Sequence, residues 1–81
     1  MAAMIEELES VVLTADVPED GLAKGDIGTV VLVIGGGKAY MVEFMTLTGR
    51  TLAVATLEAN QVRPLAADDI ANARKVALAE A

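Results

Sequence analysis

Apolar runs of strand length alternate with short polar or glycine-containing breaks along most of this chain. The longest run, at 27–34, is continuously apolar and rich in Val and Ile, and the glycines beside it favour a buried strand over a helix segment. Gly35-Gly36-Gly37-Lys38 then reads as a hairpin turn. Five strands are predicted in all, at 11–14, 27–34, 39–45, 50–57 and 62–65.

Alternation within the strands predicts which side chains face the core. In 39–45, Tyr40, Val42 and Phe44 fall on one face, so we expect them to be buried. In 50–57, Leu52 and Val54 are the core candidates. Between the first two strands, Pro18 and the Asp20-Gly21 pair indicate a long loop. We expect Leu22 to pin this loop onto the core, and residues 58–61 to form one 3₁₀ turn.

The two ends of the chain follow a helical pattern. Residues 1–9 carry apolar side chains at helical spacing and predict a short N-terminal helical turn. Residues 66–81 are Ala-rich, with Asp68 as a candidate N-cap, and Arg74 and Lys75 placed late, where cations complement a helix dipole. The fold class predicted is therefore all-β with a terminal helix. It is a single domain in which an SH3-like barrel of about five antiparallel strands, residues 10–65, precedes a C-terminal α-helix, residues 66–81.

Composition excludes several classes of function. The 81 residues include no Cys and no His, which excludes disulfides, the usual zinc sites and a Ser–His nucleophile pair, so we expect neither a metal, nor a cofactor, nor an enzyme. The net charge of −6 argues against nucleic-acid binding and is compatible with a basic protein partner. No apolar run is long enough to cross a membrane and no signal segment begins the chain, so a cytoplasmic protein is expected.

Several exposed positions are candidates for an interaction surface. Acidic residues gather in the first loop, which is either simply solvated or a docking patch for a basic partner. Glu43 either forms a surface ion pair with a nearby arginine or belongs to a recognition patch, and the methionines beside it either pack under the C-terminal helix or form a dimer surface. The candidate residues are Asp16, Glu19, Asp20, Met41, Glu43, Met45, Arg50, Arg63 and Val76.

An ordered series of motifs resembles a known bacterial family. It comprises Asp16-x-Pro18-Glu19-x-Gly21-Leu22-x-x-Gly25-Asp26-x-Gly28-Thr29-Val30-Val31, then Tyr40-x-Val42-Glu43-Phe44, Gly49-x-Thr51 and Val62-Arg63-Pro64-Leu65. The series is similar to the family called domain of unknown function 4926, over roughly residues 8–65. The resemblance implies an SH3-like barrel and gene neighbourhoods of mobile or toxin–antitoxin type. It supplies no catalytic or binding residues, and the Ala-rich tail lies outside it.

These observations lead to one expected function and one alternative. The expected function is a non-catalytic protein-interaction module, regulatory or antitoxin-like. The alternative is a nucleic-acid- or ribosome-associated module, by analogy with other SH3-like barrels. Small barrels are marginal alone, so we also expect a homodimer, formed through Met41 and Met45, through the C-terminal helix around Val76, or through both.

Overall fold

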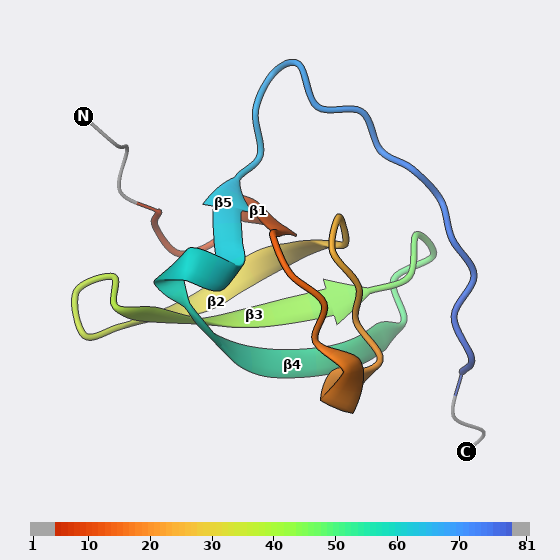
Figure 1. Ribbon diagram of the computed structural model, residues 1–81, viewed down its shortest axis with the longest axis horizontal. Helices are drawn as coiled ribbons and strands as arrows, with labels where there is room; N and C mark the ends of the chain where they lie inside the picture. The colour runs from red at the N-terminus through yellow and green to blue at the C-terminus, as the bar shows by residue number, and fades with distance from the viewer. Residues whose placement is uncertain (1–4, 79–81) are drawn as a thin grey trace.

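A five-stranded antiparallel sheet makes up the body of the protein in the computed structural model, which describes residues 5–78 (Figure 1). Its strands lie in the order β4-β3-β2-β1-β5. The predicted all-β class and the number of strands are therefore confirmed. The strands are β1 (Ser10–Leu13), β2 (Ile27–Ile34), β3 (Ala39–Met45), β4 (Thr51–Glu58) and β5 (Val62–Pro64), with 3₁₀ turns η1 (Pro18–Asp20) and η2 (Ala59–Gln61).

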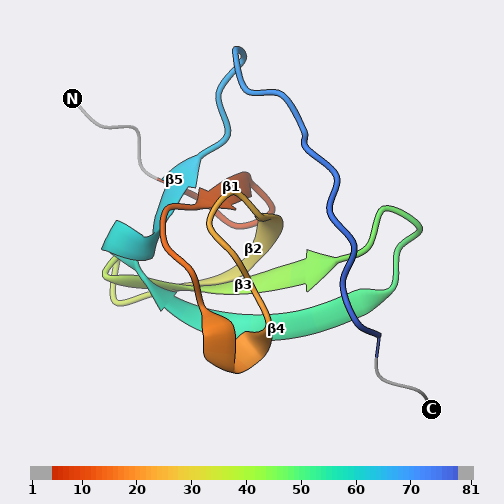
Figure 2. The same cartoon turned by 45° about the vertical axis from the view of Figure 1, so that its right-hand side comes forward.

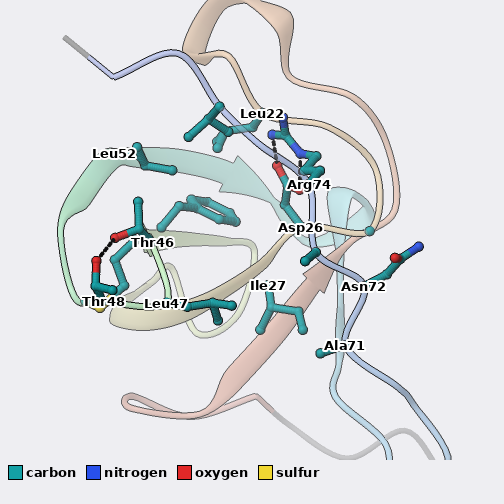
Figure 3. A pocket seen from close by; sticks show the side chains of 15 residues that line it. Leu22, Asp26, Ile27, Thr46, Leu47, Thr48, Leu52, Ala71, Asn72 and Arg74 are labelled. Carbon is teal, nitrogen blue, oxygen red and sulfur yellow. Dashed lines mark hydrogen bonds and ion pairs between the residues drawn. The ribbon is translucent and has the colours of Figure 1, made fainter.

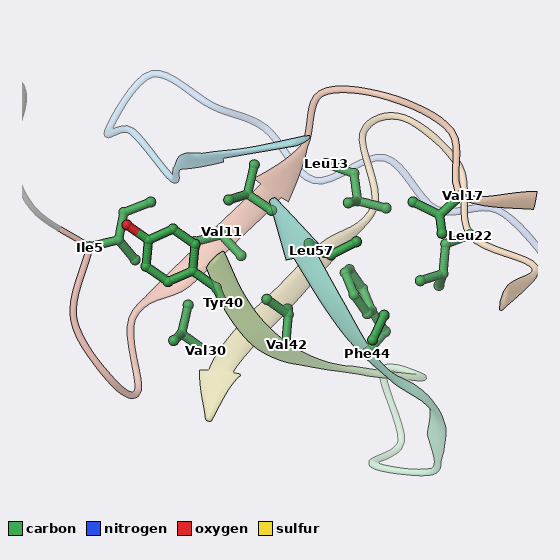
Figure 4. Packing of buried hydrophobic residues seen from close by; sticks show 12 residues of the cluster. Ile5, Val11, Leu13, Val17, Leu22, Val30, Tyr40, Val42, Phe44 and Leu57 are labelled. Carbon is green, nitrogen blue, oxygen red and sulfur yellow. The ribbon is translucent and has the colours of Figure 1, made fainter. Parts of the chain in front are cut away.

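The sheet bends so that β1 and β5 lie over β3 and β4, and the core fills the space between them (Figures 1 and 4). Tyr40, Val42 and Phe44 of β3 all point into this core, as their alternation predicts. Leu22 is also buried there, and the backbone of Val17 pairs with that of Leu22, so the loop is pinned as expected. The fully buried centre consists of Val11, Leu13, Val30 and Val42.

The core face of β4 is the opposite of the predicted one. Val54 is 52% exposed and Leu52 is half-buried, whereas Ala55 and Leu57 are buried. The pairing with β3 decides this, because Val42 lies opposite Ala55 and residues opposite each other in a sheet point to the same side. The register places the smaller alanine on the core side and sends the larger valine outward.

A glycine at the start of β2 lets two strands approach closely. A Cβ atom on Gly28 would lie 2.5 Å from Cγ1 of Val42 and 2.8 Å from Cε1 of Phe44. The corner before it joins β1, since the amide of Leu13 donates to the carbonyl of Asp26 at 2.9 Å. The Gly-Asp-x-Gly corner therefore attaches the long loop to the sheet and fixes where Asp26 sits.

The predicted C-terminal helix is wrong. From residue 69 to 78 the described tail contains no helix; it leaves β5, turns back and runs along the body as an extended segment (Figures 1 and 2). Short helices depend on packing an apolar face, and Ile70, one of the few large apolar side chains of the tail, is 89% exposed. Asp68 caps no helix, and Asp69 instead closes a turn at the beginning of the tail by accepting the amide hydrogen of Ala66 at 2.7 Å.

The predicted N-terminal helical turn falls partly on residues 1–4, which lie outside the described residues. Residues 5–9 form a single turn in which the amide of Glu9 donates to the carbonyl of Glu6 at 3.2 Å. Leu8 adopts a left-handed conformation with φ of 71° and is 80% exposed, while its amide donates to the carbonyl of Val30. Ile5 lies in the core, so the segment extends the body of the protein.

Candidate functional site

A groove of about 550 Å³ lies between the body and the C-terminal tail. One wall is the corner before β2 together with Leu22, and a second is the end of β3 with the β3–β4 turn (Figure 3). Tail residues 71–74 and Val76 form the third wall. The apolar side chains that line the body's side are Leu22, Ile27, Phe44, Met45, Leu47 and Leu52.

Several of these apolar side chains are not covered. Leu47, in the β3–β4 turn, is 94% exposed, and Met45 and Ile27 are 45% and 39% exposed. Phe44 and Leu22 lie beneath them and are buried in the core. The groove is thus an apolar surface supported by the core, and the tail leaves much of it open.

An arginine–aspartate pair holds the tail against the body. Nε of Arg74 donates to Oδ1 of Asp26 at 2.8 Å, and Nη2 donates to Oδ2 at 2.5 Å (Figure 3). Nη2 also donates to the carbonyl oxygen of Gly21 at 3.2 Å. Two parallel hydrogen bonds to one carboxylate match the planar guanidinium fork, so the site selects for arginine geometry as well as for charge.

The loop itself holds the carboxylate of Asp26 in place. Its Oδ2 atom accepts the amide hydrogen of Ala23 at 2.9 Å, and its side chain is 18% exposed. The hydrogen bonds from Arg74 lower the pKa of Asp26 most; partial burial opposes that shift, and the bond from Ala23 adds to it. Asp26 is thus held as an anion pointing toward the tail.

A second ion pair sets the direction of the tail where it leaves β5. Both terminal nitrogens of Arg63 donate to Asp69, at 2.9 and 2.8 Å. These bonds, with the amide of Ala66, lower the pKa of Asp69 to about 2. The tail is therefore turned by the Arg63–Asp69 pair and then fastened by Arg74.

The acidic candidates lie next to this fastening point. Oδ1 of Asp16 accepts the amide hydrogen of Lys24 at 2.8 Å. The hydrogen bonds to Asp26 are the main cause that raises the pKa of Arg74, and the charge of Asp16 adds a smaller contribution. Asp20 lines a smaller hollow together with Arg74 and Lys75. Glu19 is exposed on η1. The structure thus brings Asp16 and Asp20 close to the basic residues of the chain's own tail.

The remaining candidates are divided between two faces. Met45 and Val76 line the groove, whereas Met41 and Glu43 lie on the outward face of the sheet, where Glu43 accepts a hydrogen bond from the hydroxyl of Thr51 at 2.7 Å. Met41 does not lie under a helix, since none covers this face in the part of the chain described. A homodimer through the outward face stays a prediction, which a molar mass in solution would test. Arg63 pairs with Asp69, and the amide of Arg50 donates to the hydroxyl of Thr46 at 3.0 Å.

Sequence reasoning missed three residues at the centre of the site: Asp26, Arg74 and Leu47. Asp26 and Arg74 are separated by 48 positions in the chain, so no local pattern predicts that they meet. Leu47 stood in a turn between two strands. Its apolar side chain in an otherwise polar turn is a weak signal, because single exposed leucines are common on protein surfaces.

The charged side chains that line the groove are Asp26 and Arg74, which are paired with each other. Residues 5–78 contain no group of three or more His, Cys, Asp or Glu side chains arranged to hold a metal ion. Asp26, the carboxylate of the groove, is neutralised by an arginine and carries a lowered pKa, which is unsuited to a general acid or base at neutral pH. No helix within the described residues is long and apolar enough to cross a membrane.

Fold and site together define a small all-β protein with an apolar groove closed on one side by its own tail. Residues 7–64 match the family described as Domain of unknown function (DUF4926), and the chain therefore belongs to this family. The predicted resemblance is confirmed. No curated protein and no solved structure matches the chain. The matched residues include Asp26 and the apolar side chains on the body's side of the groove, and they end before the tail.

Proposed function

We propose that this protein is a non-catalytic protein-interaction module that binds an extended segment of a partner protein in the groove. The observation that carries the proposal is the position of the chain's own tail. Residues 71–76 run in an extended conformation along the groove, and Arg74 is bound there by three hydrogen bonds. A surface that accommodates one extended segment can accommodate another with the same polar anchor.

The proposal includes a finer description of the fold, an SH3-like barrel. The strand order, the bend that brings β1 and β5 over β3 and β4, and the 3₁₀ turn between β4 and β5 support it. The groove of this chain lies between the long loop after β1 and the β3–β4 turn. That position leaves the core intact when the groove is filled or emptied, as expected of a binding site placed on a rigid scaffold.

Charge and exposed apolar area both favour a protein segment as the ligand. Three acidic side chains, Asp16, Asp20 and Asp26, lie around the fastening point, and the whole chain carries a net charge of −6. Nucleic acid would be repelled by this surface, whereas a basic segment would be attracted to it. The exposed side chains of Leu47 and Met45 would gain from being covered by apolar residues of the same segment.

The test compares two variants that each add one negative charge to an exposed apolar position. Leu47→Glu alters the groove, and Val54→Glu alters the outward face of the sheet. A partner captured from the native host by the wild-type chain is purified, and its affinity for the wild-type chain, for Val54→Glu and for Leu47→Glu is measured by calorimetry. We expect Leu47→Glu to weaken this affinity about tenfold or more, as removing a central contact does.

Two results would contradict the proposal. One is a partner that binds Leu47→Glu as tightly as it binds the wild-type chain. The other is micromolar binding of single-stranded RNA or duplex DNA in fluorescence anisotropy, weakening steeply as salt is added, since that salt dependence is the mark of phosphate contacts.

A further inference from the structure

The tail is fastened to the groove mainly through one side chain. Of the described residues 66–78, all are exposed except Asp69 and Val76, which are half-buried. Asp69 belongs to the turn after β5, so Arg74 and Val76 make the main contacts with the groove itself. A segment held by so few contacts is at the low end of local stability and opens readily.

The site that receives Arg74 is built by the body and does not depend on the tail. The side chain of Asp26 accepts the amide hydrogen of Ala23. Its backbone is also fixed, because its amide donates to the carbonyl of Ala23 at 3.0 Å and its carbonyl accepts the amide hydrogen of Leu13 at 2.9 Å. The carbonyl of Gly21, the third acceptor, follows η1 in the same loop. A guanidinium site is therefore ready before any guanidinium arrives, which lowers the cost of binding one.

The tail fills the site that binds arginine but leaves apolar side chains of the groove exposed. Beside Arg74 it presents Ala71, Ala73 and Val76 to the groove. These small side chains leave the hollow of about 550 Å³ unfilled, with Leu47 and Met45 still exposed. A ligand with the same arginine and larger neighbours would bury more apolar area in the same place.

We propose that the ligand of the groove is an extended segment of a partner protein. This segment presents an arginine to Asp26 and, to Ile27, Met45 and Leu47, aliphatic side chains larger than those of the tail. The chain's own tail is a weak internal competitor for the same place. The inference rests on the function proposed above and adds the chemistry of the partner and a means of regulation. Arginine is specified over lysine, because a lysine ammonium cannot make the paired hydrogen bonds to Asp26 and reach Gly21 in the same plane.

The experiment uses full-length proteins and synthetic peptides, followed by amide chemical shifts. The peptides are a copy of residues 66–78, the same copy with Arg74→Lys, and the copy with Ala71 and Ala73 both replaced by leucine. The proteins are the wild-type chain, Arg74→Ala, and Lys75→Ala as a control that removes the same charge one position away. Unchanged sheet resonances show that each variant is folded.

We expect the copy peptide to bind Arg74→Ala about threefold to fivefold more tightly than it binds the wild-type chain, because a tethered tail competes at an effective concentration in the millimolar range but is held by a weak, part-exposed ion pair. Lys75→Ala should resemble the wild-type chain. The Arg74→Lys peptide should bind Arg74→Ala about twofold to fourfold more weakly than the copy, and the double-leucine peptide more tightly. The shifted resonances should be those of residues 21–27 and 44–48.

Equal binding of the copy to wild-type and Arg74→Ala proteins, or no binding to either, would overturn the proposal, as would equal binding of the arginine and lysine peptides. Its failure is distinguishable from failure of the proposed function. If the peptides fail but a partner still binds in a way that Leu47→Glu abolishes, the groove is an interaction site with a different specificity. If Leu47→Glu has no effect on any partner, the interaction function itself is wrong.

Discussion

The sheet and the tail are both rich in apolar residues, yet they are held by opposite kinds of contact. In the sheet, Val and Leu side chains alternate toward one face and are buried, as Val11, Val30 and Val42 are completely. In the tail most apolar residues are alanines, whose single methyl groups gain little from burial, and the segment is held by the side chains of Asp69 and Arg74. Apolar content therefore orders a segment only when the side chains are large and share a face.

The strongest test of this contrast places the same charged side chain at either of two neighbouring positions of β4. Ala55→Glu places a charge in the core opposite Val42 and should lower the free energy of unfolding by more than about 3 kcal/mol, or prevent folding. Val54→Glu, one position away on the outward face, keeps its charge in solvent, and the loss caused by repulsion from Glu43 directly opposite should be limited to about 1 kcal/mol. Urea unfolding followed by circular dichroism measures both. Similar losses for the two variants would show that the register of β4 is wrong.

Close packing in the body should make even one methyl group costly. Gly28→Ala would place its Cβ atom against Val42 and Phe44, and it should destabilise the protein by about 1–3 kcal/mol. Thr29→Ala, at the next position, removes atoms from a half-buried side chain and should cost less. The same urea titration compares them, and a neutral Gly28→Ala would contradict the close approach of β2 and β3.

Acid should release the tail while the sheet stays folded. Folding lowers the pKa of Asp26. Its contribution to the free energy of unfolding is therefore complete above the ordinary carboxyl pKa of about 3.9, and it is lost as the pH falls through the lower pKa of the folded state. The charged groups facing Arg74 are Asp26 and Asp16, with Asp20 and Lys75 nearby. For an exposed pair of this kind the loss should be at most about 1 kcal/mol.

Amide shifts of residues 71–76 should therefore move toward unfolded values below about pH 4 in the wild-type chain. In Arg74→Ala they should already be there at neutral pH and should change little on acidification. The Arg63–Asp69 turn should persist further, since the pKa of Asp69 is about 2. Tail resonances that are insensitive to Arg74→Ala would show that other contacts hold the segment.

The smallest expected effect is a gain in stability at the N-terminal turn. Leu8 holds a φ of 71° with its side chain 80% exposed, so it bears the cost of a left-handed conformation without burying area. Leu8→Gly removes that cost, offset in part by the greater freedom of glycine in the unfolded chain, and should raise stability by about 0.5 kcal/mol. Glu7→Gly, beside it, should not. A loss of stability in Leu8→Gly would indicate that the leucine makes a contact that holds the turn.

The sequence by itself determined the local elements of the body and the side chains at its centre. Val and Ile content, the period of two in 39–45, and the Gly, Pro and Asp breaks predict five strands close to their observed bounds, with Tyr40, Val42 and Phe44 inside. These are properties of neighbouring residues, and in a strand the side-chain direction follows from backbone geometry alone.

Tertiary structure decided the face of β4, the course of the tail and the site. In β4, the pairing that sets Ala55 opposite Val42 places Ala55 and Leu57 on the core face and turns Val54 outward, although valine is more apolar than alanine. The tail has a helical composition, but a helix needs a surface for its apolar face, whereas Asp69 and Arg74 found partners that only the folded body supplies. The groove exists because Asp26, Leu47 and Arg74 meet in space, and contacts between distant positions leave no trace in the local pattern of a single sequence.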